Sequence, residues 1–213
     1  LNGVWLGGGA VSDMEREGGL KPGELPILPA AKALRDTRQE PEDPYLFCMP
    51  QGAVRSQPYP WRWVQNYTHK KPTHLFQLHE GNIHTYRQIF MDGRAHPPEL
   101  DPTWFGHSIG RYDGDTLVID TIGFNDKFWF DRKGNPHTEQ LHTIERWTRV
   151  DMGHMENKMT IDDPGAYARP FDLKFNARLS NPGDEIMEYI CQENNQYGIA
   201  GGHENPVPKL YQK

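Results

Sequence analysis

The sequence predicts an all-β protein that folds as an eight-stranded antiparallel up-and-down barrel of the lipocalin type. From residue 73 onward, stretches rich in β-branched and aromatic residues alternate with turn sequences such as EGN, YDGD and DDPG. The stretch FDLKFNARL alternates apolar and polar residues, which is typical of a strand with one buried face. Eight such strands in chain order can close into a barrel that holds one small ligand. A β-sandwich is the alternative, although it commonly needs long crossovers.

Residues 1–72 are rich in Pro and Gly, which favours an extended arm that belongs to the same domain as the barrel. One short helix is predicted at PAAKALRDTR, residues 29–38, because proline is favoured in the first turn of a helix. The barrel is expected over residues 73–195, followed by a C-terminal tail over residues 196–213. The predicted strands lie near residues 74–80, 83–91, 106–112, 115–122, 142–149, 155–161, 170–179 and 185–192.

Composition narrows the range of partners. The chain has 213 residues, of which 36% are hydrophobic, and this is enough for one domain with a buried core. A net charge of −6 without a cluster of Lys and Arg gives no reason to expect nucleic acid as a partner. No apolar run approaches the roughly 18 residues of a membrane span. The opening LNGVWLGGG has neither an initiator Met nor a cationic leader, so we expect a trimmed N terminus, while the oligomeric state stays open.

An arginine in the first predicted hairpin suggests a site inside the barrel. A two-residue Gly-Asn loop would pair Phe76 with Arg87 and place both on the apolar, inward face. Burying an unpaired guanidinium costs several kcal/mol. Arg87 therefore needs either an oxygen-rich or anionic ligand, or an internal carboxylate such as Glu80 or Glu188.

Further residues extend this predicted ligand site. A four-residue loop would pair Trp147 with Lys158 on the outside, which turns Arg146 and Asn157 inward. The alternating strand FDLKFNARL contributes an apolar inner face. Together these side chains predict a ligand that joins oxygen or negative charge to an aromatic or apolar body. The predicted ligand-binding residues are Arg87, Arg146, Asn157, Trp129, Phe171 and Phe175.

The long insertion GFNDKFWFDRKGNPHTEQ suggests catalysis, because long insertions in a meander of short turns are often functional. Its aromatics, Trp129 among them, could form a lid over the barrel mouth. Asp131 and His137 in the insertion, together with Tyr167, are the candidate acid–base groups. A packed plug with a satisfied histidine is the alternative. We therefore expect a metal-independent acid–base enzyme of lyase, isomerase or hydrolase type acting on a small molecule, or else a non-catalytic binding protein.

The sequence gives weaker evidence for a His–Asp dyad, a metal site, a serine hydrolase or a dinucleotide-binding protein. His107 and Asp120 would face each other across a two-residue Asp-Gly turn and form a His–Asp dyad, which occurs both in general bases and as a plain structural bond. His79 and His84 could form a metal pair, but their face is polar and no third ligand is visible nearby. The sequence has no G-x-S-x-G motif, and GGGAVS lacks the dinucleotide-binding spacing. We expect neither a metal nor another cofactor.

The chain contains two cysteines, Cys48 and Cys191, far apart in the sequence. They could form a disulfide if the protein is exported, or they could be two buried free thiols. Composition alone leaves both possibilities open.

Three motifs, SIGRYDGDTLVIDTIGFND, GNPHTEQ and TIDDPGAY, resemble those of a group of exported bacterial proteins of uncharacterised function, and the likeness covers most of residues 40–195. The resemblance implies a periplasmic or secreted protein whose mature chain begins near Leu1. With export, we expect Cys48 to be bonded to Cys191. The resemblance also directs attention to Arg87, Arg111, Asp131, His137, Glu145, Arg146 and Tyr167.

Overall fold

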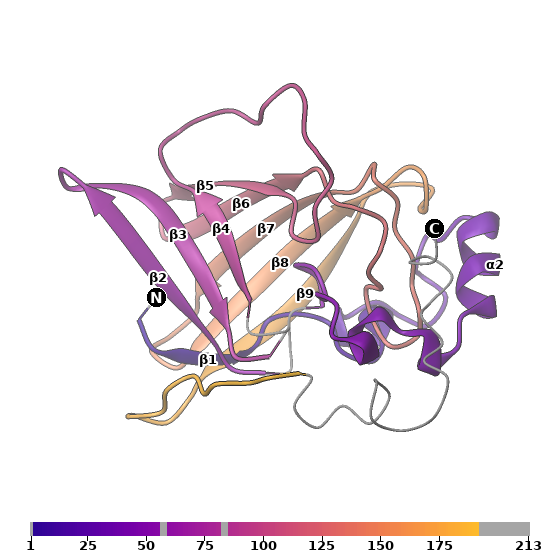
Figure 1. The fold of residues 1–213 in the computed structure, drawn as a ribbon, viewed down its shortest axis with the longest axis horizontal. Coiled ribbons are helices and arrows are strands. Elements are labelled where there is room, and N and C mark those ends of the chain that lie inside the picture. Colours follow the sequence, from indigo (N-terminus) through magenta and orange to yellow (C-terminus); the bar gives the residue numbers. More distant parts are fainter. Residues whose placement is uncertain (1, 56–58, 82–84, 192–213) are drawn as a thin grey trace.

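The computed structural model describes residues 2–55, 59–81 and 85–191, and in this part of the chain nine strands form a closed barrel in chain order (Figure 1). The strands are β1 (Val4–Gly7), β2 (Trp61–Thr68), β3 (Lys71–His79), β4 (Tyr86–Phe90), β5 (His107–Asp113), β6 (Thr116–Ile122), β7 (His142–Arg149), β8 (His154–Asp162) and β9 (Phe171–Leu179). β1 closes the barrel by pairing antiparallel with both β2 and β9.

The barrel prediction is confirmed, but the strand count and the purely antiparallel pattern are wrong. β1 and β2 come from the segment expected to be an extended arm, and residues 185–191 form no strand. β2 follows Pro60 and has the period of a strand, because Trp61 and Trp63 are buried while the residues between and after them are not. β4 and β5 pair in parallel over only two residue pairs, which the long connection over residues 91–106 permits.

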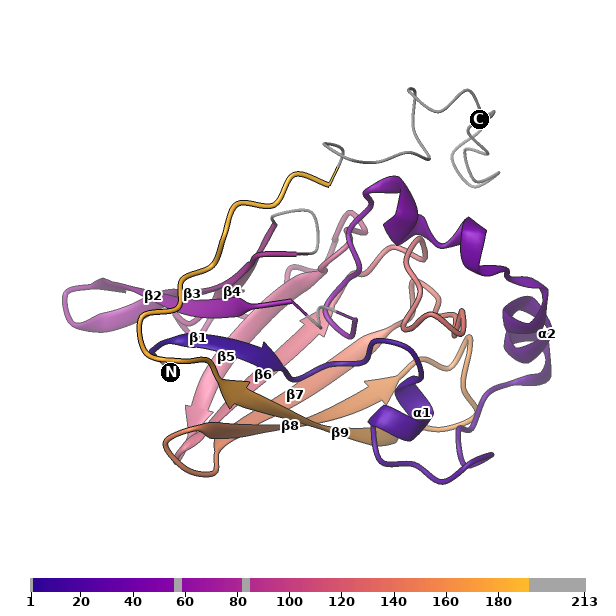
Figure 2. The ribbon, with the colours of Figure 1, turned by 90° about the horizontal axis from the view of Figure 1, so that it is seen from below.

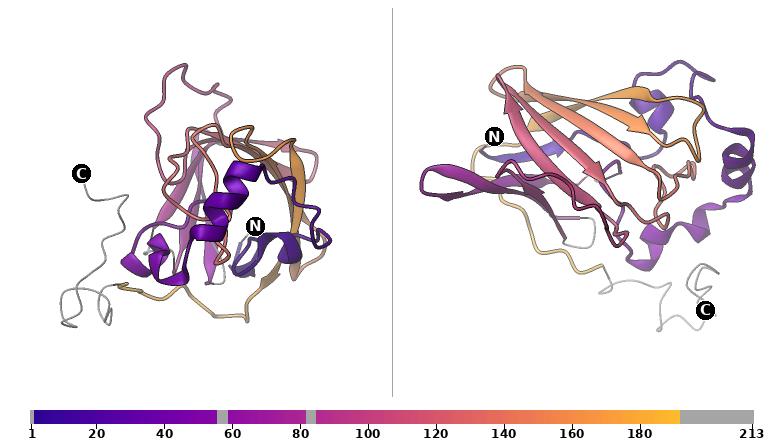
Figure 3. Two further views of the ribbon diagram at one scale, coloured as in Figure 1. Left: turned by 90° about the vertical axis from the view of Figure 1, so that its right-hand side faces the viewer. Right: turned by 90° about the horizontal axis from the view of Figure 1, so that it is seen from above.

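The helices lie outside one end of the barrel (Figures 2 and 3). They are α1 (Met14–Glu17), α2 (Pro29–Thr37) and two 3-10 turns, η1 (Glu40–Glu42) and η2 (Pro44–Phe47). The prediction of α2 is confirmed, with proline in its first turn. Cys48, directly after η2, forms a disulfide with Cys191, as the resemblance implies. No helix of the described part is long and apolar enough to cross a membrane. The predicted tail, residues 196–213, lies outside the described residues.

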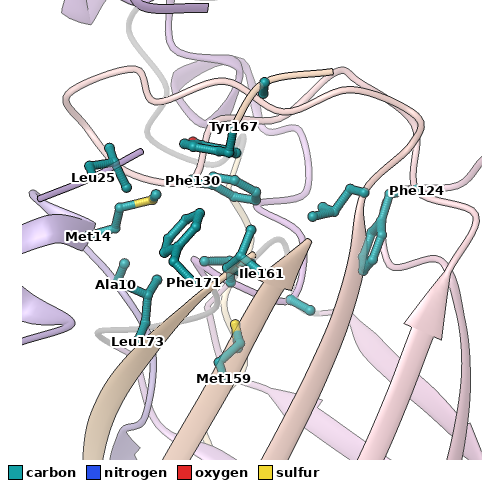
Figure 4. Close-up of a cluster of buried hydrophobic side chains, with 14 of the residues drawn as sticks. Ala10, Met14, Leu25, Phe124, Phe130, Met159, Ile161, Tyr167, Phe171 and Leu173 are labelled. Carbon is teal, nitrogen blue, oxygen red and sulfur yellow. The ribbon is translucent and has the colours of Figure 1, made fainter. Parts of the chain in front are cut away.

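The barrel interior contains two apolar clusters. We call the first the tryptophan cluster; it includes Trp5, Trp61, Trp63, Leu75, Ile89, Met91, Leu117, Ile119, Trp147, Met155 and Ala177. We call the second the plug; it closes the end of the barrel near the helices (Figure 4) and includes Met14, Phe124, Phe128, Phe130, Met159, Ile161, Tyr167, Phe171, Leu173 and Phe175. The insertion after β6 supplies three of the phenylalanines.

Buried polar residues lie between these two clusters. On β6, Thr121 follows Ile119 of the tryptophan cluster and precedes Phe124 of the plug. On β8, Asn157 likewise separates Met155 from Met159. We call this set the polar layer; it comprises Gln77, His79, Arg87, Ser108, Thr121, Thr143, Glu145 and Asn157.

Candidate functional site

The centre of the polar layer is an ion pair between Arg87 on β4 and Glu145 on β7. Nη1 of Arg87 lies 2.6 Å from Oε1 of Glu145, and the two side chains are 1% and 2% exposed. Arg87 also donates to Ser108 Oγ at 3.1 Å and to Thr121 Oγ1 at 2.7 Å. Because Glu145 neutralises the guanidinium inside the barrel, Arg87 does not require an anionic ligand.

The second carboxylate oxygen of Glu145 also accepts a hydrogen bond. Trp147 Nε1 donates to Glu145 Oε2 at 3.0 Å, so the ion pair is tied to the tryptophan cluster. Asn157 Nδ2 donates to the carbonyl oxygen of Gly8 at 3.1 Å. Gly8 has a φ of +97°, and a Cβ there would lie 2.4 Å from the Trp147 ring. Only glycine allows the backbone to approach this closely.

Several buried polar atoms of the layer and its border have no hydrogen-bond partner among the described residues. They include both ring nitrogens of His79, the hydroxyl of Thr143, the amide oxygen of Asn157 and the indole nitrogen of Trp63, whose cross-strand neighbour is Gln77. Leaving such a group unbonded costs roughly 1–3 kcal/mol. Native proteins seldom accept several of these costs in one place. The layer therefore has free bonding capacity for a bound molecule.

His79 is the titratable group of the layer that is not part of an ion pair. Burial, with a smaller contribution from the positive charge of Arg87, lowers the pKa of His79 to about 3. Its ring is stacked on Phe105, with 6.1 Å between the centroids. His79 is therefore neutral at physiological pH, with one nitrogen able to donate a hydrogen bond and the other able to accept one.

The prediction that Arg87 faces inward is confirmed, but the register used to reach it is wrong. In the structure Gln77, not Phe76, pairs with Arg87. A shift of one residue reverses every side chain of a strand, so Gln77 and His79 are buried in place of Phe76 and Leu78. His84, the proposed metal partner of His79, lies outside the described residues. The internal carboxylate is Glu145 rather than Glu80 or Glu188.

The predicted register of the β7–β8 hairpin is wrong in the same way. Trp147 pairs with Asn157 and Arg146 pairs with Lys158, one residue away from the predicted register. Asn157 is inside, as predicted, but Arg146 is on the outer face, where its Nη1 donates to Thr160 Oγ1 at 3.3 Å. The sequence missed Glu145 and Thr143 as interior residues because polar side chains on a strand usually face solvent. Only the motif resemblance drew attention to Glu145.

The predicted catalytic residues Asp131 and Tyr167 lie together in the plug, and both are buried. Asp131 accepts hydrogen bonds from Met14 N at 2.7 Å and from the backbone and side chain of Asn135. Burial nevertheless raises the pKa of Asp131. Tyr167 donates its hydroxyl to Pro136 O at 2.9 Å, and burial raises its pKa well above the ordinary value. These bonds hold the insertion against α1 and the β8–β9 connection.

His137 is enclosed by aromatic rings. Its centroid lies 3.9 Å from that of Phe128 and 4.9 Å from that of Phe130, and burial lowers the pKa of His137 to about 3. Trp129 is buried beneath the guanidinium of Arg38, which lies 5.0 Å from its ring. The insertion thus packs as a plug, but its histidine is only partly satisfied: Nδ1 of His137 lies 3.3 Å from Thr138 O, and Nε2 has no partner among the described residues.

The two predicted ligand-binding phenylalanines also belong to the plug. Phe171 contacts Tyr167, with 4.9 Å between the ring centroids. Phe175 pairs with Asn157 across β8 and β9, so it borders the polar layer. The inward face of β9 is as predicted.

The predicted partners His107 and Asp120 are linked through His96 rather than bonded to each other. In the structure Ile109, not His107, pairs with Asp120. The carboxylate of Asp120 is bonded to His142 Nε2 at 2.8 Å and to His96 Nε2 at 3.2 Å, and Nδ1 of His96 lies 2.8 Å from Nδ1 of His107. The bond to Asp120 raises the pKa of His142 and lowers that of the carboxyl. His96, on the β4–β5 connection, could not have been found from strand register.

No group of three or more His, Cys, Asp or Glu residues in the described part of the chain is arranged to hold a metal ion. Comparison with known proteins gives no match, whether with protein-family models, curated proteins or solved structures. The resemblance carried by the three motifs stays a prediction. Function is therefore argued from geometry.

Proposed function

We propose that the protein binds a small uncharged, oxygen-bearing molecule in the polar layer of its barrel. The observation that carries this proposal is the group of buried, unbonded polar atoms on His79, Thr143, Asn157 and Trp63. They include donors and acceptors, which suits hydroxyl or carbonyl groups. Because Arg87 is paired with Glu145 and His79 is neutral, the layer has no net charge that would favour an anion. The neighbouring tryptophans suit an aromatic or apolar body.

A ligand would enter the layer through the seam between β4 and β5. These strands share only two residue pairs, and parallel pairing is slightly less stable than antiparallel pairing. A pocket of about 390 Å³ lies over the seam and is lined in part by Phe105 and Ser108. Phe105 stacks on His79, and Ser108 is bonded to Arg87. A ligand in this pocket would be one side chain away from the layer.

Acid–base catalysis by His137, Asp131 and Tyr167 receives less support. All three are buried in the plug, where the carboxylate of Asp131 and the hydroxyl of Tyr167 are bonded to neighbouring residues. A histidine with a pKa of about 3 is also a weak general base at neutral pH. We therefore favour the binding role over the enzyme.

The test is a thermal-shift screen with uncharged phenols and hydroxyketones. A ligand at 100 times its Kd stabilises the folded state by about 2.7 kcal/mol. We expect hits among the uncharged compounds. The double variant His79→Leu/Thr143→Val should weaken a hit by at least about tenfold, since each lost hydrogen bond contributes roughly 1 kcal/mol.

Thr148→Val is the matched control, because Thr148 lies on β7 as Thr143 does, but on the outer face and bonded to Thr116. Its binding should equal that of the unaltered protein. Equal binding by the double variant, with its fold intact, would contradict the proposal.

A further inference from the structure

A second pocket lies on the outside of the barrel. It has a volume of about 240 Å³, lies over β5, β6 and β7, and is lined by three arginines, Arg94, Arg111 and Arg146. This volume is below the range of about 300–1,000 Å³ that is typical for drug-sized ligands. The pocket would therefore hold a small molecule.

The strand register places the arginines around an apolar floor. Arg111, Val118 and Arg146 form one row across the three strands. Neighbouring strands are about 4.8 Å apart. The Cα atoms of the two arginines therefore lie about 10 Å apart, one on each side of Val118. In the next row of the same face, Ile109 and Ile144 flank Asp120. The floor is formed by the three aliphatic side chains.

The charges around the pocket leave a positive excess. Arg94 is paired with Asp92, and it also lies over the Phe90 ring at 4.0 Å. Asp120 is bonded to His96 and His142. Within the described part of the chain, Arg111 has no ion pair or hydrogen bond through its side chain, and Arg146 is bonded only to a threonine hydroxyl. The three arginines against the carboxylates of Asp92 and Asp120 leave one positive charge, because Asp172, which also interacts with Arg146, is paired with Lys158.

We propose that this pocket binds a small organic monocarboxylate, whose charge is held by Arg111 and Arg146 and whose apolar body lies on Ile109, Val118 and Ile144. A guanidinium matches a carboxylate with two parallel hydrogen bonds. One excess positive charge favours a monoanion, and Asp120, between Ile109 and Ile144, repels a second carboxylate. The inner neighbours of Val118 on β6, Leu117 and Ile119, belong to the tryptophan cluster. The barrel wall therefore separates this pocket from the polar layer, and the two proposals are independent.

The test is a titration of methyl-labelled protein with benzoate, followed by NMR. We expect the methyl signals of Ile109, Val118 and Ile144 to shift, while the methyl signal of Met155 inside the barrel stays unchanged. Benzamide has the same body without the charge and should bind at least about tenfold more weakly. Inorganic phosphate has the charge without the body and should also bind more weakly.

Arg111→Gln and Arg146→Gln should each raise the Kd of benzoate by at least about tenfold. Arg178→Gln is the control, because Arg178 is an exposed arginine on β9 that does not line the pocket. Its Kd should equal that of the unaltered protein. A thermal melt verifies that each variant is folded.

Three outcomes would overturn the proposal. Benzoate could leave the three methyl signals unshifted, the folded Arg111 and Arg146 variants could bind it as tightly as the unaltered protein, or phosphate could shift the same signals at equal affinity. None of these results would affect the interior site, which is tested with other ligands and other variants.

Discussion

The plug and the polar layer both bury polar side chains, but they differ in what those side chains bond to. In the plug, the carboxylate of Asp131 accepts three hydrogen bonds, and the Tyr167 hydroxyl donates to a backbone carbonyl. In the polar layer, the Thr143 hydroxyl and the Asn157 amide oxygen have no partner among the described residues. Within the described ranges, the plug has a comparable atom in Nε2 of His137.

The difference shows what buried polarity is used for in each region. Bonds in the plug join the insertion after β6 to α1 and to the β8–β9 connection, so its polar groups fix one arrangement of the chain. Polar atoms in the layer are left over after the Arg87–Glu145 pair is formed. Residues of similar type therefore hold segments of the chain together at the end of the barrel, and at its centre they leave unbonded atoms for the ligand that we propose.

The largest expected effect comes from breaking the ion pair of the layer. Arg87→Met would leave Glu145 charged and buried without a counter-ion, which should lower the free energy of unfolding by about 3–5 kcal/mol. Urea denaturation measures the change. In Arg87→Met/Glu145→Gln the charge is removed, while the amide oxygen can still accept from Trp147, so most of the loss should be recovered. A loss below about 1 kcal/mol in the single variant would mean that the pair is not buried as described.

A smaller effect on stability is expected from removing a buried hydroxyl, and its size should depend on whether that hydroxyl is hydrogen-bonded. Tyr167→Phe in the plug removes the donor to Pro136 O and should lower the free energy of unfolding by about 1–3 kcal/mol. Thr143→Val in the layer removes a hydroxyl that has no partner among the described residues, so stability should be unchanged or increased. Denaturation of the two variants side by side tests the comparison. Equal losses in both would show that the Thr143 hydroxyl has a partner in solution.

The effect that is smallest at neutral pH is a pH dependence shared by His79 and His137. Both have a pKa of about 3 in the folded protein, against about 6.5 for an ordinary histidine. The unfolded chain therefore takes up protons that the folded chain does not, and the free energy of unfolding falls as the pH drops from about 6.5 towards 3. Each histidine contributes up to about 1.4 kcal/mol per pH unit.

The variants His79→Gln and His137→Gln should each remove one such contribution from the slope of stability against pH. Denaturation at several pH values between 4 and 7 measures it. Equal reductions would show that both rings stay dry. A smaller reduction for His79 would sharpen the comparison, because it would indicate that water enters the layer but not the plug.

The sequence predicted most of the strands because turn chemistry and alternation are local signals. Alternation in β9 gave the correct inner face, since no assumption about a loop was needed. In the β3–β4 and β7–β8 hairpins the predicted register was wrong by one residue. The inner face was therefore predicted correctly for β4 and β8 and was reversed for β3 and β7. β1 was missed because its four residues follow Gly3, end in Gly7 and precede two more glycines, which disfavour a strand.

The site was harder to predict than the fold for a physical reason. Hydrophobic periodicity assigns polar residues to the outside, and an interior layer built from Thr143, Glu145 and Gln77 looks like a surface. Arg87 and Asn157 were correctly placed inside the barrel because the other residues on the same face of their strands are mostly apolar. The link from His96 to Asp120 depends on how the β4–β5 connection folds, and no local pattern encodes that contact.

The pairing of β1 with β9 has a consequence for how the chain acquires its shape. The first strand of the barrel finds one of its two partners only when synthesis has passed Leu179, roughly tens of seconds after Val4 at ordinary rates of translation. Until then the open edges belong to β1 and to the last strand made, and both can pair with other chains. Such distant pairing is intrinsically slow, because the entropy of closing a long loop is lost before any contact compensates for it. The interval before closure is the period in which this protein is most exposed to aggregation.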